Sequence, residues 1–194
     1  MKFFKSALLA GLLGVQALGA VVPTVFQRDD IAPLPEDKTY VPINEARREH
    51  AGWALWTDGL ETCIAVVARD RAPRAAGEWD KILAHVSSHL CTDQDGIGID
   101  DQINNIFALY DSAPFQIPEV YVFIPAPKME GQQQFNEYVV ESVFAKADER
   151  HFIKSFLLRD DSQLDGEGGS RLWIDDSKSV YWSQNMKLFG PPPM

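Results

Sequence analysis

The sequence predicts a mixed α+β (α/β) domain in which sheets and helices form separate layers. Three observations support this fold class. Short stretches rich in β-branched and aromatic residues, typical of strands, recur between residues 51 and 182. Two longer segments place apolar residues at helical spacing. Turns marked by Gly, Pro and Asp separate these segments, and no internal repeat is visible.

The N-terminus has the pattern of a secretory signal peptide. Lys2 and Lys5 form a positive start, an apolar run continues to Leu18, and the small residues Gly19 and Ala20 end it. The run is too short to span a bilayer. We therefore expect residues 1–20 to be removed and the protein to be secreted, as about 170 residues that suffice for one domain.

The segments around the domain are rich in proline. Residues 21–45 contain four prolines among charged residues and show no sustained period, so they are predicted to form an extended tail or linker. The last residues, 190–194, include three consecutive prolines and are predicted to be a C-terminal tail. Residues 46–189 then form a single domain.

Within that domain, strand and helix patterns alternate. Strands are predicted at residues 51–56, 62–68, 81–87, 120–124, 152–158, 172–174 and 180–182. A helix is predicted at residues 100–109, because acids stand at its start and Ile103 and Ile106 lie on one face. A second helix is predicted at residues 132–147 from the four-residue spacing of apolar positions such as Phe135 and Val139.

The net charge limits the classes of molecule that we expect the protein to bind. The formal net charge is −10, and no cluster of Lys and Arg is present outside the leader. A strongly acidic surface repels phosphate backbones and anionic lipids, so neither nucleic acid nor a membrane surface is an expected partner. No apolar stretch is long enough for a membrane anchor. We expect an acidic, monomeric, extracellular protein.

The segment from Thr57 to Cys63 contains the strongest candidate for catalysis. It reads Thr-Asp-Gly-Leu-Glu-Thr-Cys and leads into an apolar strand. A cysteine placed there, just after a glycine turn, is a suitable nucleophile, and the backbone N–H groups of Leu60, Glu61, Thr62 and Cys63 can form an oxyanion hole. His85 lies in the next predicted strand, so antiparallel pairing of the two strands would place it beside Cys63.

These residues resemble the chemoreceptor glutamine deamidases of bacteria, the CheD family, and the related catalytic domain of the cytotoxic necrotizing factor toxins. The resemblance covers about thirty residues, from the Thr57–Cys63 motif to the Ala-His pair that ends in His85. It implies that the domain is a catalytic-like one with a deamidase-like α/β/β/α sandwich fold. The reaction that it implies needs neither a metal nor an organic cofactor. It also implies that Cys63 is the nucleophile, His85 the base, and Thr57 the residue that orients His85.

The implied reaction is hydrolysis of a glutamine side chain on a partner or host protein through a thioester, as in an effector or toxin. If an amine replaced water, the same site would transglutaminate, and the sequence leaves both outcomes open. The chain departs from the family between the two strands. Residues 69–80 form a longer connection, and Ile82 and Leu83 replace the glycine pair that precedes the family's histidine.

Two alternatives remain open. The chain has only two cysteines, Cys63 and Cys91, and a secreted protein by default joins such a pair as a disulfide. The protein would then be a non-catalytic binding module, for example for glycans, which stack on aromatic rings. It has five tryptophans, of which alternation predicts Trp53 and Trp182 to be buried and Trp173 to be the most exposed.

A further acidic segment, residues 93–100, has acids at alternate positions and a turn glycine. It lacks the full spacing and the closing glutamate of a calcium loop. A solvated loop that leads into the first helix accounts for it better, so no metal site is expected there.

Overall fold

The computed structural model describes residues 35–87, 98–159, 170–182 and 186–190. The signal-peptide prediction, Cys91 and most of the acidic segment 93–100 lie outside these residues. No helix in the part that the structure describes is both long enough and apolar enough to cross a membrane.

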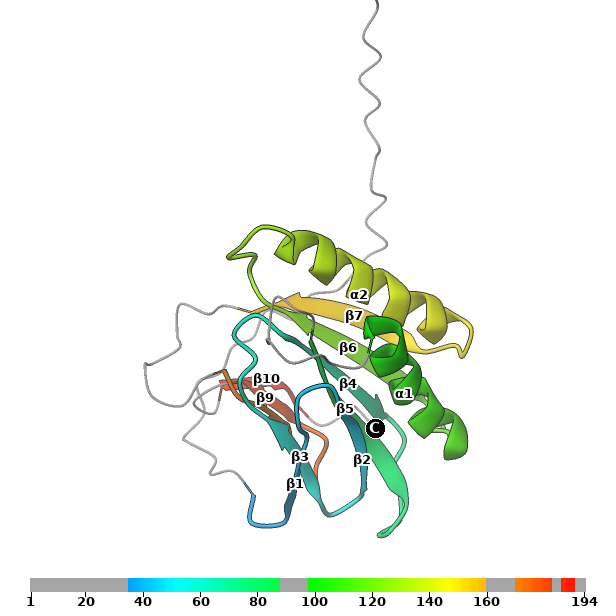
Figure 1. Cartoon of the computed structure of the whole chain (residues 1–194). Helices are drawn as coiled ribbons and strands as arrows, with labels where there is room; N and C mark the ends of the chain where they lie inside the picture. The colour runs from blue at the N-terminus through cyan, green and yellow to red at the C-terminus, as the bar shows by residue number, and fades with distance from the viewer. Residues whose placement is uncertain (1–34, 88–97, 160–169, 183–185, 191–194) are drawn as a thin grey trace, which may run out of the picture.

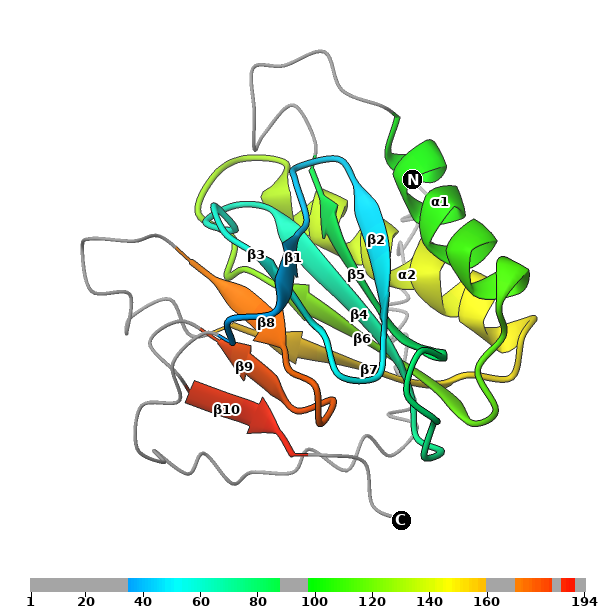
Figure 2. The same cartoon turned by 90° about the horizontal axis from the view of Figure 1, so that it is seen from below.

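The described strands form two five-stranded sheets. Sheet A has the order β1 (Lys38–Tyr40), β3 (Ala54–Thr57), β8 (Leu172–Ile174), β9 (Val180–Trp182) and β10 (Met186–Phe189). Sheet B has the order β2 (Ala46–His50), β5 (Trp79–Val86), β4 (Ile64–Asp70), β6 (Pro118–Ile124) and β7 (Ile153–Leu158). Both are mixed, because β1 pairs with β3 and β6 pairs with β7 in parallel while the other pairs are antiparallel (Figure 2).

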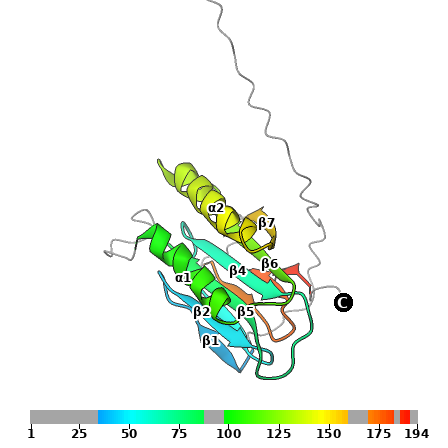
Figure 3. The same cartoon turned by 90° about the vertical axis from the view of Figure 1, so that its right-hand side faces the viewer.

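The two helices, α1 (Ile99–Ser112) and α2 (Gln132–Asp148), cover one face of sheet B, and sheet A packs on its other face (Figures 1 and 3). The predicted α+β class is therefore confirmed. The layers among the described residues are helices, sheet B and sheet A. A second helical layer, outside sheet A, is not among the described elements.

Strand β4 lies at the centre of this arrangement. All seven of its residues are buried, which is why it reads as a nearly continuous apolar run. Its alternate residues enter two cores: Ile64 and Val66 pack toward the helices, and Ala65 and Val67 pack toward sheet A. A residue that continues the second series at the start of β4 must lie between the sheets.

The loop from β3 to β4 crosses from one sheet to the other. Gly59 has φ of 69° there, a left-handed conformation that glycine adopts without the steric cost of a Cβ. Strands β3 and β4, which follow each other in the chain, therefore belong to different sheets. As a result, the segment between them, residues 58–63, lies at one end of the space between the sheets.

The prediction that residues 21–45 form a loose tail is wrong for its last part. Residues 38–40 form β1, and Val41 is fully buried in the core between the sheets. Val41 N–H also donates to Trp56 O at 2.8 Å. The folded domain therefore begins before residue 46, because β1 completes the edge of sheet A.

Candidate functional site

Cys63 lies immediately before β4 and faces the core between the sheets. Its side chain packs in that core with Leu60, Ala65 and Trp182, and only 1% of the residue is exposed. The alternation along β4 explains this direction, since Cys63 continues the series of Ala65 and Val67. The predicted nucleophile is therefore buried between the sheets.

His85 lies on the neighbouring strand and faces the same way. Strands β4 and β5 are antiparallel, as predicted, with Ala65 opposite His85 and Ile64 opposite Val86. Cys63 is therefore the diagonal neighbour of His85 on one face of the sheet, a pairing whose Cβ atoms lie within about 7–8 Å. His85 is 2% exposed, and its Nε2 atom has no hydrogen-bond partner in this conformation, Cys63 Sγ included.

Thr57 makes the contact with His85 that the resemblance implies. Thr57 Oγ1 lies 2.9 Å from His85 Nδ1 and 2.8 Å from Val41 O. A carbonyl oxygen can only accept, so the single hydroxyl proton of Thr57 points to Val41 O. The hydroxyl oxygen then accepts a hydrogen bond from His85 Nδ1–H. This arrangement selects the tautomer in which Nε2 carries a lone pair, as a general base requires.

Burial lowers the pKa of His85 from 6.5 to about 4. The negative charge of Asp58 opposes this effect, and the positive charge of Arg159 adds to it. The imidazole is therefore neutral at physiological pH. A neutral ring with Nδ1 protonated is the form that can take a proton from a thiol.

The loop before Cys63 is held by hydrogen bonds from three separate segments. Leu60 N–H donates to Ser170 O at 3.2 Å, and the side-chain amide of Gln132 donates to Thr62 O at 3.1 Å. The guanidinium of Arg159 donates to Cys63 O at 2.8 Å. These contacts fix the peptide groups on both sides of Cys63, which is the kind of support that a precise catalytic geometry needs.

The same contacts correct the predicted oxyanion hole. Leu60 was included in that prediction, but its N–H is already bonded to Ser170 O and is therefore committed. The N–H of Glu61 has no such partner among the described residues. The predicted set therefore loses Leu60, and Glu61 is its clearest remaining donor.

Arg159 and Trp182 are site residues that the sequence analysis missed. Arg159 follows the last residue of β7 and is 2% exposed, and its guanidinium lies 4.7 Å from the centre of the Trp182 ring. Trp182, on β9, was predicted to be buried and is 2% exposed. The only sequence signal for Arg159 is a basic residue at the end of an apolar strand.

Both helices support the strand ends at the site. Gln132 is fully buried in the first turn of α2, where its Oε1 accepts from Lys128 N–H while its amide binds Thr62. Gln102 of α1 binds Ser87 by two hydrogen bonds, from Ser87 N–H at 2.9 Å and to Ser87 O at 3.0 Å. Ser87 follows β5, two residues beyond His85. The helices therefore fix the ends of β4 and β5 where Cys63 and His85 lie.

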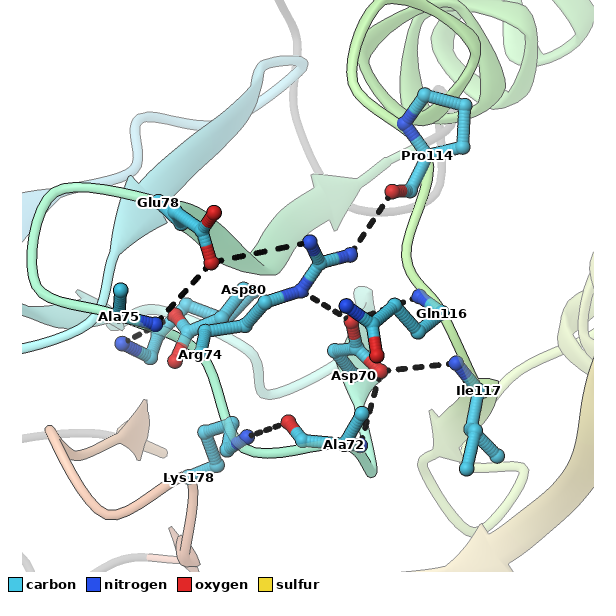
Figure 4. Close-up of polar contacts among 11 residues, drawn as sticks. Asp70, Ala72, Arg74, Ala75, Glu78, Asp80, Pro114, Gln116, Ile117 and Lys178 are labelled. Atoms are coloured by element: carbon cyan, nitrogen blue, oxygen red, sulfur yellow. Dashed lines mark hydrogen bonds and ion pairs between the residues drawn. The ribbon is translucent and has the colours of Figure 1, made fainter.

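A second cluster of buried polar groups lies at the other ends of β4 and β5 (Figure 4). Asp70 accepts four hydrogen bonds, from the N–H groups of Ala72, Gln116 and Ile117 and from Arg74 Nε. Burial raises the pKa of this carboxyl, but the four donors outweigh it and hold the pKa below its usual range. Both oxygens are occupied, so this cluster is structural. Among the described residues, no group of His, Cys, Asp and Glu is arranged to hold a metal ion.

The exposures of Trp173 and Trp53 are the reverse of those predicted. Trp173 was expected to be the most exposed, but it is 2% exposed and stacks on Tyr181 with ring centres 5.1 Å apart. Trp53 was expected to be buried, but it is 38% exposed, at the turn between β2 and β3. Alternation gave the correct side of the strand for Trp173 but could not show that its aromatic neighbours cover it.

The sequence matches no known family model, and no curated protein is significantly similar to it.

Proposed function

We propose that this protein is a secreted cysteine amidohydrolase that deamidates glutamine side chains of a partner protein. The observation that carries the proposal is the hydrogen bond from His85 Nδ1 to Thr57 Oγ1, beside a cysteine on the same face of the sheet. Together these three residues supply an orienting group, a base in the required tautomer and a nucleophile. The layering of helices, sheet B and sheet A supports it further, since it accounts for three layers of an α/β/β/α deamidase-like sandwich.

The reaction follows from the groups present. His85 Nε2 takes the proton of the Cys63 thiol while the sulfur bonds to the carboxamide carbon. The C–N bond of the resulting tetrahedral intermediate then breaks, and the proton on His85 passes to the nitrogen, which leaves as ammonia. Water attacks the thioester with His85 again as base, the C–S bond breaks, and the thiol regains its proton. The product is a glutamate side chain.

Charge around the site suits the negative charge that develops in this reaction. The buried guanidinium of Arg159 is bonded to the carbonyl of Cys63 and lies near enough to His85 to lower its pKa. A fixed cation in a site of low dielectric stabilises an oxyanion more strongly than it would in water. The backbone N–H of Glu61 adds a neutral donor on the same loop.

The substrate can reach Cys63 only after a change from this conformation. Cys63 and His85 are 1% and 2% exposed, so a protein side chain reaches the sulfur only after covering groups move aside. Hydrogen bonds between a nucleophile and its base are often made only in the complex with substrate. In this proposal the hydrogen bond between Cys63 Sγ and His85 Nε2 therefore forms when the substrate enters.

Ammonia release tests the proposal directly. The purified protein, kept under reducing conditions with casein as a glutamine-rich substrate, should release ammonia and raise the substrate mass by about one dalton per event, since an acid replaces an amide. Cys63→Ser and His85→Ala should each abolish the release. Addition of methylamine separates hydrolysis from transglutamination, because transfer would attach the amine to the substrate.

A wild-type protein that releases no ammonia and whose Cys63 is bonded to Cys91 would overturn the proposal. It would favour the alternative, a binding module with a structural disulfide. The burial of Trp173 removes the main support for a glycan-binding form of that alternative.

A further inference from the structure

Among the described residues, three buried polar atoms around Cys63 and the loop before it have no hydrogen-bond partner. They are His85 Nε2, Trp182 Nε1 and Ser170 Oγ, and each belongs to a residue that is at most 2% exposed. An unpartnered buried polar atom destabilises the folded state, so native proteins rarely keep several together without a function. Their chemistry differs: Nε2 of this tautomer can only accept, whereas the indole N–H can only donate.

The register of sheet A places Trp182 in one row with Thr57, the residue that contacts His85. Thr57 pairs with Leu172, and Leu172 pairs with Trp182, so the three form one row across β3, β8 and β9. Thr57 contacts His85 at one end of this row. Trp182 stands at the other end and packs in the same core as Cys63.

Arg159 connects Trp182 to Cys63. Its guanidinium stacks on the indole ring at 4.7 Å and donates to Cys63 O at 2.8 Å. In sheet B, the strand of His85 lies on one side of β4, and the strand that leads to Arg159 lies on the other side, beyond β6. Cys63 is therefore flanked by an acceptor, His85 Nε2, and by a group of donors, Arg159 and Trp182.

We propose that Trp182 is a substrate-binding residue whose indole N–H binds the carbonyl oxygen of a primary carboxamide. The inference rests on the proposed function and assigns a residue that binds its substrate. A carboxamide offers one acceptor, its oxygen, and one donor group, its NH2. The oxygen binds on the side of Trp182 and Arg159, and the nitrogen lies on the side of His85, which protonates it after Nε2 has taken the proton of the Cys63 thiol. A carboxylate would instead place a second, negatively charged oxygen beside the lone pair of Nε2, so the site favours the amide over the product acid.

Trp182→Phe tests this assignment, because phenylalanine keeps a ring for Arg159 to stack on and removes only the indole and its N–H. We expect kcat for ammonia release to fall by about a hundredfold, as for the loss of one oxyanion donor. The matched control is Trp173→Phe. Trp173 is equally buried in the same sheet, stacks on Tyr181 and faces away from Cys63, so kcat should not change.

Alkylation of Cys63 provides a second readout that does not need turnover. Iodoacetamide has a primary carboxamide, whereas methyl methanethiosulfonate modifies thiols without one. The ratio of the two modification rates at Cys63, measured by mass spectrometry of the reduced protein, should fall by about tenfold in Trp182→Phe, the loss of about one hydrogen bond. It should stay unchanged in Trp173→Phe.

The outcomes separate the two proposals. If the wild type releases ammonia but Trp182→Phe keeps both kcat and the rate ratio, the role of Trp182 is wrong and the deamidase proposal stands. If no ammonia appears but the rate ratio still depends on Trp182, the site binds carboxamides without hydrolysing them. A reduced protein in which neither reagent modifies Cys63 would contradict both.

Discussion

Burial of His85 makes the stability of the protein depend on pH. The folded state holds the pKa of this imidazole at about 4, whereas its ordinary value is 6.5. Between these values the unfolded chain binds a proton that the folded protein does not. The free energy of unfolding should therefore decrease as the pH falls from 6.5 to 4, by up to about 3 kcal/mol, and this contribution should be fully present above pH 6.5.

Urea denaturation at pH 7 and pH 4.5 measures this effect. The readout is the difference between the two free energies of unfolding, so a change in overall stability of a variant does not matter. His85→Asn should reduce the difference, because asparagine does not titrate. His151→Asn is the control, since His151 is exposed and has φ of 59°, a conformation that asparagine tolerates. An unchanged pH dependence in His85→Asn would show that His85 is not buried in its neutral form.

The same residue shows what could be predicted of the site. Alternation along two adjacent strands was enough to place Cys63 and His85 on one face, and the motif was enough to bring Thr57 to His85 Nδ1. Arg159 and Trp182 were missed because their contacts depend on folding over long distances. Arg159 bonds to a residue 96 positions away, and no local pattern specifies that contact.

At the scale of elements, apolar periodicity predicted β3 to β9 and both helices within a few residues. It missed β1, β2 and β10. Strand β2 includes Arg47, Arg48 and Glu49, so it shows no apolar alternation. It forms because it pairs with β5 at the edge of sheet B, where Arg48 stacks on Trp79 at 4.4 Å. Such a strand is specified by its neighbours and not by its own composition.

The side chain of Asp70 connects three segments of the chain. Its substitution should therefore destabilise the fold by more than the loss of one hydrogen bond would. It ends β4, bonds to Ala72 and Arg74 in the following loop, and accepts from two N–H groups of the segment just before β6. In Asp70→Asn only one oxygen can accept, which leaves part of these donors unpaired. We expect a loss of about 3–5 kcal/mol, as for a broken buried ion pair.

Glu78→Gln is the matched control for Asp70→Asn. Glu78 belongs to the same cluster (Figure 4), but its side chain is 53% exposed and lies 3.9 Å from Arg74. Its substitution should change the free energy of unfolding by less than about 1 kcal/mol. Equal effects of the two variants in urea denaturation would contradict the role of Asp70 as the link between these elements.

At the scale of the whole molecule, sheet B separates two cores of different composition. The core toward the helices is formed by aliphatic and aromatic side chains, with Val66 and Val139 as fully buried examples. The core between the sheets contains Cys63, and the buried polar side chains of His85 and Thr57 lie against it. On the proposed function, the chemistry is therefore confined to one face of sheet B. This division explains how a fully buried histidine can be retained, since the first core supplies packing without it.

Whether Cys63 is a free thiol or part of a disulfide decides between the proposed function and its alternative. On the disulfide alternative, the bond to Cys91 closes a loop of about 28 residues, and Cys91→Ser should lower the free energy of unfolding by about 2–4 kcal/mol. On the proposed function, the thiol of Cys63 is needed for chemistry. Cys91→Ser should then leave stability nearly unchanged and leave ammonia release intact, or raise it by removing a competing partner for the sulfur.

A cycle of variants distinguishes these cases, with unfolding measured in the absence of reductant. A disulfide predicts that Cys63→Ser, Cys91→Ser and the double variant all lose the same stability, because either substitution removes the one bond they share. A catalytic thiol predicts that only the variants lacking Cys63 lose ammonia release and that Cys91→Ser unfolds like the wild type. Equal destabilisation of the three variants, with a wild type that never releases ammonia, would contradict the proposed function. It would favour the alternative, a non-catalytic binding module with a disulfide between Cys63 and Cys91.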